Sequence, residues 1–163
     1  MSKDTGLIYL FAANAELLAK LTARQARFII VGGEAVRFYV PERQADDLDL
    51  LVEPCLRNAS LVIDAINEGA SQIYRFDAIG LAQRNIQWPV KEYYYVDILT
   101  PKAGIDFDDV WNDAVLAEVD CGDSIVSVRI AAKATLIEML RSSQEDKHKR
   151  DIEALMRVDD GWP

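Results

Sequence analysis

The residues best suited to chemistry lie in the first third of the chain, where a glycine pair precedes two closely spaced aspartates. Gly32 and Gly33 follow the apolar run Phe28–Val31, and Asp47 and Asp49 come about fourteen residues later. Glycine tolerates a positive φ and lets the backbone approach a ligand, and free N–H groups at a helix start favour phosphate. Two carboxylates on one side of a strand repel each other unless a cation lies between them. The pattern predicts a phosphate cradle beside a Mg2+ site.

A third carboxylate, Asp97, is a lone charge in the apolar and aromatic run Tyr93–Leu99. Burying an unpaired charge is costly, so Asp97 needs a partner. We expect it to lie across the sheet from Asp47 and Asp49, where it would share a two-metal site. There it could also accept a proton from an attacking hydroxyl.

The elements that must position these residues can be read from hydrophobic spacing, turn residues and β-branched runs. Helices are expected over 5–24, 34–39, 56–68, 131–141 and 147–158. Strands are expected over 28–31, 47–52, 71–76, 81–88, 93–99, 115–119 and 125–128, with a turn over 100–104. This mixture predicts an α/β (α+β) fold with a mixed sheet flanked by helices. We expect one domain over 1–163, with its core at about 5–128 and C-terminal helices at about 130–158.

Composition narrows the class of protein. The 163 residues are 50% hydrophobic and 28% charged, with a formal net charge of −9. That acidity disfavours a dedicated nucleic-acid or anionic-membrane binder. The apolar run Leu7–Ala13 is too short to span a bilayer, and Asp4 ahead of it disfavours a signal peptide. We therefore expect a cytoplasmic protein whose two cysteines, Cys55 and Cys121, are buried or half-buried thiols.

Taken together, the motifs resemble the DNA polymerase β-like nucleotidyltransferase superfamily, in particular its minimal bacterial members. These include abortive-infection and toxin–antitoxin nucleotidyltransferases and the small lincosamide nucleotidyltransferases. The resemblance covers residues 5–157. It rests on the following matches: Gly32, Gly33, Ala35, Arg43, Asp47, Asp49, Asp97, Leu136-Ile137-Glu138-Met139, Lys147 and Asp151-Ile152-Glu153-Ala154-Leu155.

The resemblance implies transfer of a nucleoside monophosphate from an NTP, with ATP the expected nucleotide, to an acceptor hydroxyl. Asp47, Asp49 and Asp97 would be the catalytic residues and would hold two Mg2+ ions. Gly32 and Gly33 would bind phosphate. The acceptor could be a small molecule, a protein side chain or RNA, and the acidity favours a cationic small molecule or a protein over RNA. A role in antibiotic modification or in a toxin–antitoxin pair would follow.

Four positions depart from the family pattern. They are Ala45, Leu140, Glu145 and His148, and Leu140 and Glu145 stand where basic residues are common. The alternative is therefore a weak or inactive member of the fold that acts as a nucleotide sensor or binds a protein partner.

Several side chains keep two interpretations. Arg43 either steadies the aspartates or contacts phosphate, or else it makes an ion pair that fixes its loop to the strand. Lys147 either contacts phosphate or the acceptor, or else lies on a solvated helix face. His148 is either a surface residue or catalytic. Asp46 is expected to be a solvated neighbour of the site. The acidic residues from Asp106 to Asp123 are expected to be solvated, or else to attract a basic partner or a cationic acceptor.

Overall fold

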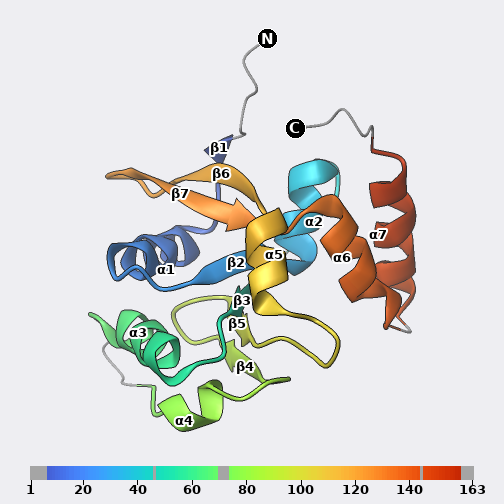
Figure 1. Ribbon diagram of the computed structural model, residues 1–163. Helices are drawn as coiled ribbons and strands as arrows, with labels where there is room; N and C mark the ends of the chain where they lie inside the picture. The colour runs from blue at the N-terminus through green and yellow to red at the C-terminus, as the bar shows by residue number, and fades with distance from the viewer. Residues whose placement is uncertain (1–6, 46, 70–73, 144, 159–163) are drawn as a thin grey trace.

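A mixed β-sheet runs through the middle of the protein (Figure 1). The computed structural model describes residues 7–45, 47–69, 74–143 and 145–158. Within these ranges one seven-stranded sheet has the order β1-β6-β7-β2-β3-β5-β4. The strands are β1 (Leu7–Ile8), β2 (Phe28–Val31), β3 (Leu48–Val52), β4 (Gln87–Val90), β5 (Val96–Leu99), β6 (Val115–Asp120) and β7 (Ile125–Ile130). Parallel and antiparallel pairs both occur, because β3 pairs antiparallel with β2 and parallel with β5.

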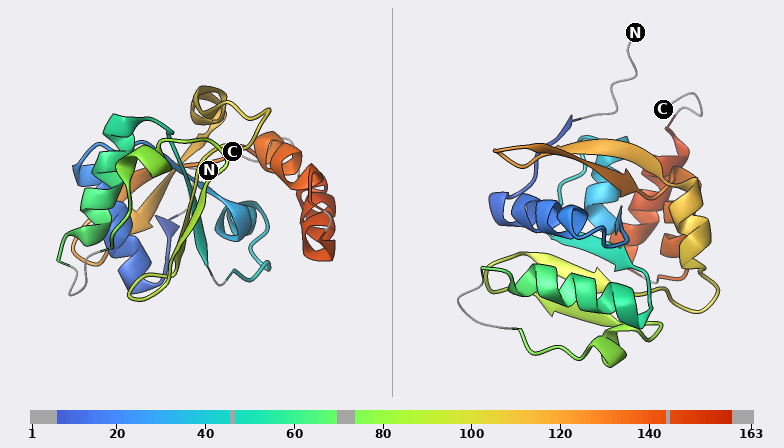
Figure 2. Two further views of the ribbon diagram at one scale, coloured as in Figure 1. Left: turned by 90° about the horizontal axis from the view of Figure 1, so that it is seen from below. Right: turned by 60° about the vertical axis from the view of Figure 1, so that its left-hand side comes forward.

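Helices cover both faces of this sheet. They are α1 (Ala12–Ala23), α2 (Gly32–Tyr39), α3 (Leu56–Asn67), α4 (Ala78–Leu81), α5 (Phe107–Asp113), α6 (Lys133–Arg141) and α7 (Asp146–Met156). The α1 and α3 helices lie on one face, and α2, α6 and α7 lie on the other (Figures 1 and 2). The predicted fold class, a mixed sheet flanked by helices with C-terminal helices, is confirmed.

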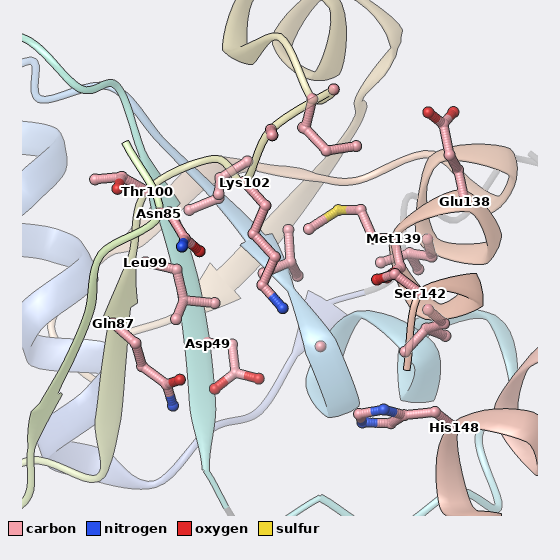
Figure 3. A pocket seen from close by; sticks show the side chains of 18 of the residues that line it. Asp49, Asn85, Gln87, Leu99, Thr100, Lys102, Glu138, Met139, Ser142 and His148 are labelled. Atoms are coloured by element: carbon pink, nitrogen blue, oxygen red, sulfur yellow. The ribbon is translucent and has the colours of Figure 1, made fainter. Parts of the chain in front are cut away.

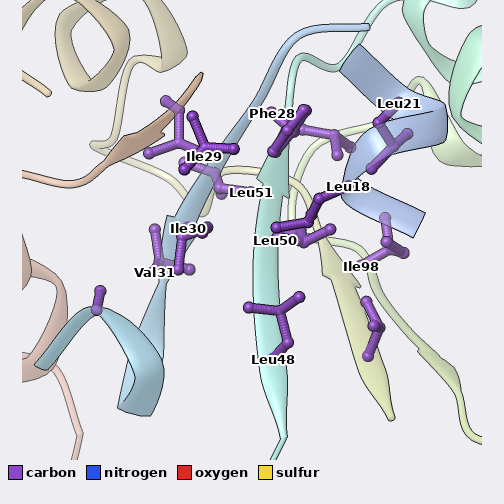
Figure 4. Packing of buried hydrophobic residues seen from close by; sticks show 14 of the residues in the cluster. Leu18, Leu21, Phe28, Ile29, Ile30, Val31, Leu48, Leu50, Leu51 and Ile98 are labelled. Carbon is purple, nitrogen blue, oxygen red and sulfur yellow. The ribbon is translucent and has the colours of Figure 1, made fainter. Parts of the chain in front are cut away.

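Side chains alternate between the two faces of the central strands, so the hydrophobic core lies on one face and the candidate site residues lie on the other. Leu48 and Leu50 of β3 and Ile98 of β5 point toward α1, whose Leu18 and Leu21 pack over them (Figure 4). Side chains two residues apart on a strand share a face. The opposite face therefore carries Val31, Asp49, Leu51, Asp97 and Leu99. Both aspartates thus project toward α2, α6 and α7, away from the apolar core.

The β2–α2 junction confirms the expected strand over 28–31 and extends the expected helix. Helix α2 begins at Gly32 rather than at Glu34, so the glycine pair forms its first turn. Val31 precedes that turn in an extended conformation. The backbone N–H groups of the glycine pair therefore belong to the open end of a helix, where they favour an anion.

The N-terminal prediction is wrong at its start. Residues Leu7–Ile8 form a short strand parallel to β6, and α1 begins only at Ala12. The leucines across 7–21 are spaced as in a helix, so their spacing alone predicts one continuous helix. Leu7 and Ile8 instead pair with strand β6.

In the middle of the chain one further strand prediction is wrong, and one helix was not predicted. The strand expected over 81–88 is instead the end of α4 followed by a loop and β4. The helix α5 was not expected at all, although Asp106 caps it by accepting a hydrogen bond from the Asp108 N–H at 3.2 Å. Of the strand expected over 71–76, residues 71–73 lie outside the described residues, as does Asp46. Residues 74–76 form no regular element.

The strand expected over 93–99 is shortened to Val96–Leu99 by a side chain. The Asn14 amide donates to the Tyr95 carbonyl at 3.1 Å and accepts from the Tyr95 N–H at 2.9 Å. The Tyr95 N–H is therefore not available to a strand ladder, although the Tyr95 carbonyl also accepts from the Leu48 N–H of β3 at 3.0 Å. Tyr94 is buried in the core, whereas Tyr93 and Tyr95 are exposed.

The remaining elements agree with prediction to within a few residues at each end, including the two C-terminal helices. The cysteine prediction is half right, since Cys121 is partly buried but Cys55 is exposed. Among the described residues, no helix is long and apolar enough to cross a membrane.

Candidate active site

A cleft of about 630 Å3 lies between the sheet and the α6–α7 pair, on the face that carries the aspartates. Six predicted site residues line it: Gly33, Arg43, Asp47, Asp49, Asp97 and Lys147. A second cavity of about 800 Å3, lined mainly by apolar side chains, shares Asp49 and His148 with the first and adds Gly32. The structure therefore brings all seven predicted site residues to adjoining cavities.

Gly32 is required where it stands. Its φ is +67°, a conformation that other residues rarely adopt. A Cβ at this position would overlap the Asp49 carboxylate and lie 2.8 Å from its Cγ. Gly33 is less constrained, because its Cβ would meet the Ala45 Cβ at 3.3 Å. The Asp49 carboxylate thus lies directly against the first turn of α2.

Asp49 and Asp97 are a cross-strand pair. Strands β3 and β5 run parallel with Asp49 in register with Asp97. Burial raises the pKa of Asp49 to about 7, and the adjacent Asp97 carboxylate adds to the shift by its charge and by a hydrogen bond. The two groups are therefore held together at a cost in electrostatic energy. A divalent cation would relieve that cost.

One lysine, Lys91, contacts both Asp47 and a member of the Asp49–Asp97 pair. Asp47 lies one residue before β3 and lines the same cleft. The Lys91 Nζ lies 2.8 Å from Asp47 Oδ2 and 3.2 Å from Asp97 Oδ2. Burial lowers the pKa of Lys91, but hydrogen bonds to both carboxylates outweigh that effect and raise it. Sequence reasoning missed Lys91, because only the β4–β5 pairing brings it to the aspartates.

The donor set suits Mg2+ bound together with a phosphate ligand. Among the described residues, no group of three or more His, Cys, Asp or Glu side chains is arranged to hold a metal ion. Mg2+ sites commonly use one or two carboxylates and complete their shell with water and substrate phosphates. The Asp49–Asp97 pair supplies hard oxygen ligands of that kind, with Asp47 beside it. The residues present therefore fit Mg2+ as two or three ligands of a shell that water and a phosphate ligand would complete.

Arg43 makes an ion pair, the second of its two interpretations, but with α7 rather than with the neighbouring strand. Its Nε donates to Asp151 Oδ1 at 2.8 Å and its Nη2 to Asp151 Oδ2 at 3.2 Å. The Asp151 side chain is only 8% exposed. This two-point contact ties the loop after α2 to the last helix. It thereby joins two walls of the cleft, and a phosphate contact by Arg43 stays a prediction.

The helical wall of the cleft carries basic and neutral polar groups. Figure 3 shows Asp49 and His148 on opposite sides of the cavity, with the Lys102 side chain pointing between them. Lys147 lines the cleft and lies 3.6 Å from Glu145 Oε2. Lys102 was missed by the motif comparison, because it lies in the loop after β5, within the expected turn over 100–104, and belongs to no pattern. It places a third basic side chain in the cleft, in addition to Arg43 and Lys147.

The four positions that depart from the family pattern all line this cleft: Ala45, Leu140, Glu145 and His148. None of the acidic residues from Asp106 to Asp123 is among the described residues that line either cavity. The departures therefore alter the candidate site itself, while the acidic tract lies elsewhere.

No protein-family model matches the chain, and no curated protein matches it at a significant level. The function must therefore be argued from the geometry of the cleft.

Proposed function

We propose that this protein is a Mg2+-dependent nucleotidyltransferase that moves a nucleoside monophosphate from an NTP, in the first instance ATP, to an acceptor hydroxyl. One observation carries the proposal. Two carboxylates, Asp49 and Asp97, lie in register on neighbouring strands, and Asp49 lies against the first turn of α2 at Gly32. A metal-binding pair beside a phosphate-binding helix start is the equipment that phosphoryl-type transfer needs.

Each side chain then has a role that matches its place. Asp49 and Asp97, with Asp47 beside them, would hold two Mg2+ ions, which neutralise phosphate charge when bound. The backbone N–H groups of Gly32 and Gly33 bind phosphate at the open end of α2. Asp97 also accepts the proton of the acceptor hydroxyl.

Basic side chains complete the phosphate site. Lys102 and Lys147 line the same cleft as the three aspartates. Lys147 contributes positive charge from the helical wall and Lys102 from the loop after β5, and a triphosphate in the cleft would lie within reach of both. They replace in part the basic groups missing at Leu140 and Glu145.

The acceptor remains one of three classes: a cationic small molecule, a protein side chain or RNA. The net charge of −9 favours the first two. Modification of an antibiotic, or action as half of a toxin–antitoxin pair, would be the biological setting.

Calorimetric titration with Mg2+ and ATP tests the proposal. We expect wild-type protein to bind ATP only when Mg2+ is present. Asp97→Asn should lose at least about tenfold in affinity, because it removes a charged ligand of the metal. Asp64→Asn, an exposed aspartate on α3, is the matched control and should bind like wild type. Equal binding by Asp97→Asn, or none by wild type, would overturn the proposal.

One observation favours a second candidate, a nucleotide sensor without turnover. Glu145 brings a negative charge into the cleft beside Lys147, at 3.6 Å. This charge weakens the phosphate site on the helical wall. Binding of Mg2+ and ATP with no pyrophosphate release, across acceptors of all three classes, would favour the sensor.

A further inference from the structure

A serine, a histidine and a glutamate form a connected group on the helical wall, where α6 leads into α7. The Ser143 Oγ contacts the His148 Nδ1. On the other side of the ring, the His148 Nε2 lies 3.5 Å from the Glu145 Oε2. All three residues line the 630 Å3 cleft that holds the aspartates.

The hydrogen bonds at Ser143 leave its proton free to be donated to the imidazole. The Glu145 backbone N–H donates to the Ser143 Oγ at 3.1 Å, and it occupies one of the two lone pairs of that oxygen. The inference requires the ring tautomer in which Nδ1 accepts from Ser143 and the proton of the neutral ring lies on Nε2, on the side of Glu145. An imidazole that accepts from a hydroxyl can activate that hydroxyl as a nucleophile, and a carboxylate near the other ring nitrogen favours this tautomer.

The neighbouring serine shows that this arrangement is specific to one position. Ser142 also lines the cleft, but its hydroxyl donates to the Met139 carbonyl at 3.2 Å, at the end of α6. Among the described contacts, Ser142 has none with His148. The chain thus offers two adjacent serines, of which one contacts a base.

We propose that Ser143 is an internal acceptor, so that the protein nucleotidylates itself. The inference rests on the proposed function, since the nucleotide and Mg2+ come from it. The Ser143 Oγ forms a bond to the α-phosphorus of ATP, while the bond from that phosphorus to the oxygen bridging to the β-phosphate breaks. Pyrophosphate leaves, and the serine proton passes to the His148 Nδ1, which for this internal acceptor takes the part that Asp97 has for an external one. The product is a phosphodiester that joins Ser143 to the nucleoside.

The first test needs neither nucleotide nor metal. His148 is the single histidine of the chain, so its ring nitrogens give one set of signals in a 15N–1H spectrum. We expect the protonated nitrogen to be Nε2 in wild type, and the Nδ1 signal to shift in Ser143→Ala but not in Ser142→Ala. A ring protonated on Nδ1, or a spectrum unchanged in Ser143→Ala, would overturn the inference.

The second test is intact-protein mass spectrometry after incubation with Mg2+ and ATP. Wild type should gain the mass of one nucleotidyl group, mapped by peptide analysis to Ser143. Ser143→Ala should gain none, and Ser142→Ala should gain as much as wild type. His148→Gln should slow the labelling by about 10²-fold, because it cannot act as a base. Melting temperatures of all variants establish that each is folded, and Ser143→Thr, which keeps a hydroxyl, should retain some labelling.

The outcomes separate this inference from the proposed function. Wild type that binds Mg2+ and ATP in the calorimeter but remains unlabelled overturns the internal acceptor and leaves the transferase intact. Labelling at another residue, or equal rates in wild type and His148→Gln, also overturns it. Wild type that does not bind the nucleotide overturns both.

Discussion

The two walls of the cleft differ in how firmly their functional groups are held. On the sheet wall, Asp97 is 15% exposed and its position is fixed by strand register with Asp49. On the helical wall, the Lys147 and Glu145 side chains are each 60% exposed. Among the ion pairs of the described residues, Lys147 contacts Glu145, and Glu145 also contacts His148. Backbone hydrogen bonds between strands can hold two like-charged side chains close together. Exposed side chains instead lie next to oppositely charged neighbours. The sheet wall is therefore preorganised, and the helical wall can adapt to its ligand.

The contact that joins the walls gives the largest expected effect. Arg43→Met should lower the free energy of unfolding by about 3 kcal/mol, because it leaves the Asp151 carboxylate buried without its ion pair. Urea unfolding measures this loss. Arg157→Met is the control, because Arg157 and Glu153 form an exposed pair 4.0 Å apart on α7 and should change stability by less than about 0.5 kcal/mol. Equal losses in both variants would show that the walls are not joined through Arg43.

The preorganisation of the sheet wall can be broken at one glycine. Gly32→Ala should cost about 2 kcal/mol from its positive φ and should displace Asp49, whose carboxylate the new Cβ would overlap. Binding of Mg2+ and ATP should be lost as well. Gly33→Ala lies in the same turn with no positive φ, and it should be close to neutral in stability. Thermal melting and calorimetry on both variants check this, and a Gly32→Ala protein that binds like wild type would contradict the geometry.

The electrostatic cost of burying Asp49 beside Asp97 should be measurable as a change in the free energy of unfolding without any ligand. Asp49→Asn should raise stability by at least about 1 kcal/mol at pH 8 in EDTA, because burial and Asp97 disfavour the ionised form. The pKa of Asp49 is raised to about 7 in the folded protein from 3.8. The folded state therefore holds this proton to higher pH, and stability falls as pH rises from about 4 to 7.

The gain from Asp49→Asn should accordingly shrink as pH falls from about 7 to 4 and vanish below about pH 3, where the carboxyl is protonated in both states. Asp64→Asn on α3, at an exposed position, is the control at pH 8 and should leave the free energy of unfolding within about 0.5 kcal/mol of wild type. A gain that is constant across this pH range would mean that like-charge repulsion does not act at this pair.

The adaptable wall should give the smallest effect. Lys147→Met should weaken binding of Mg2+ and ATP by about three- to fivefold, since an exposed charge contributes less than about 1 kcal/mol. Lys149→Met is the matched control, because Lys149 is exposed on the same helix and is not among the residues that line the cleft. Equal losses in both variants would assign the effect to general charge rather than to the cleft.

How much could be predicted from the sequence differs between these walls. The strand at Phe28–Val31 and the glycine pair were readable, because strand patterning and glycine conformation act locally. That Asp97 lies directly beside Asp49 depends on the register of β3 and β5. The break after Ile8 was not readable, because a distant strand, β6, decides it. Lys91 was not readable either, since its partners lie up to 44 residues away along the chain.

The sequence by itself determined the type of sheet, the spacing of Asp47 and Asp49, and a glycine pair that tolerates a positive φ after the strand. Only the tertiary structure decided what these groups face. It placed Lys91 between Asp47 and Asp97, paired Arg43 with Asp151, and brought Ser143 and His148 into the cleft. Local periodicity fixes the face on which a side chain projects. Register between distant strands and the packing of the last helices fix its partners, because both depend on burial summed over the whole core.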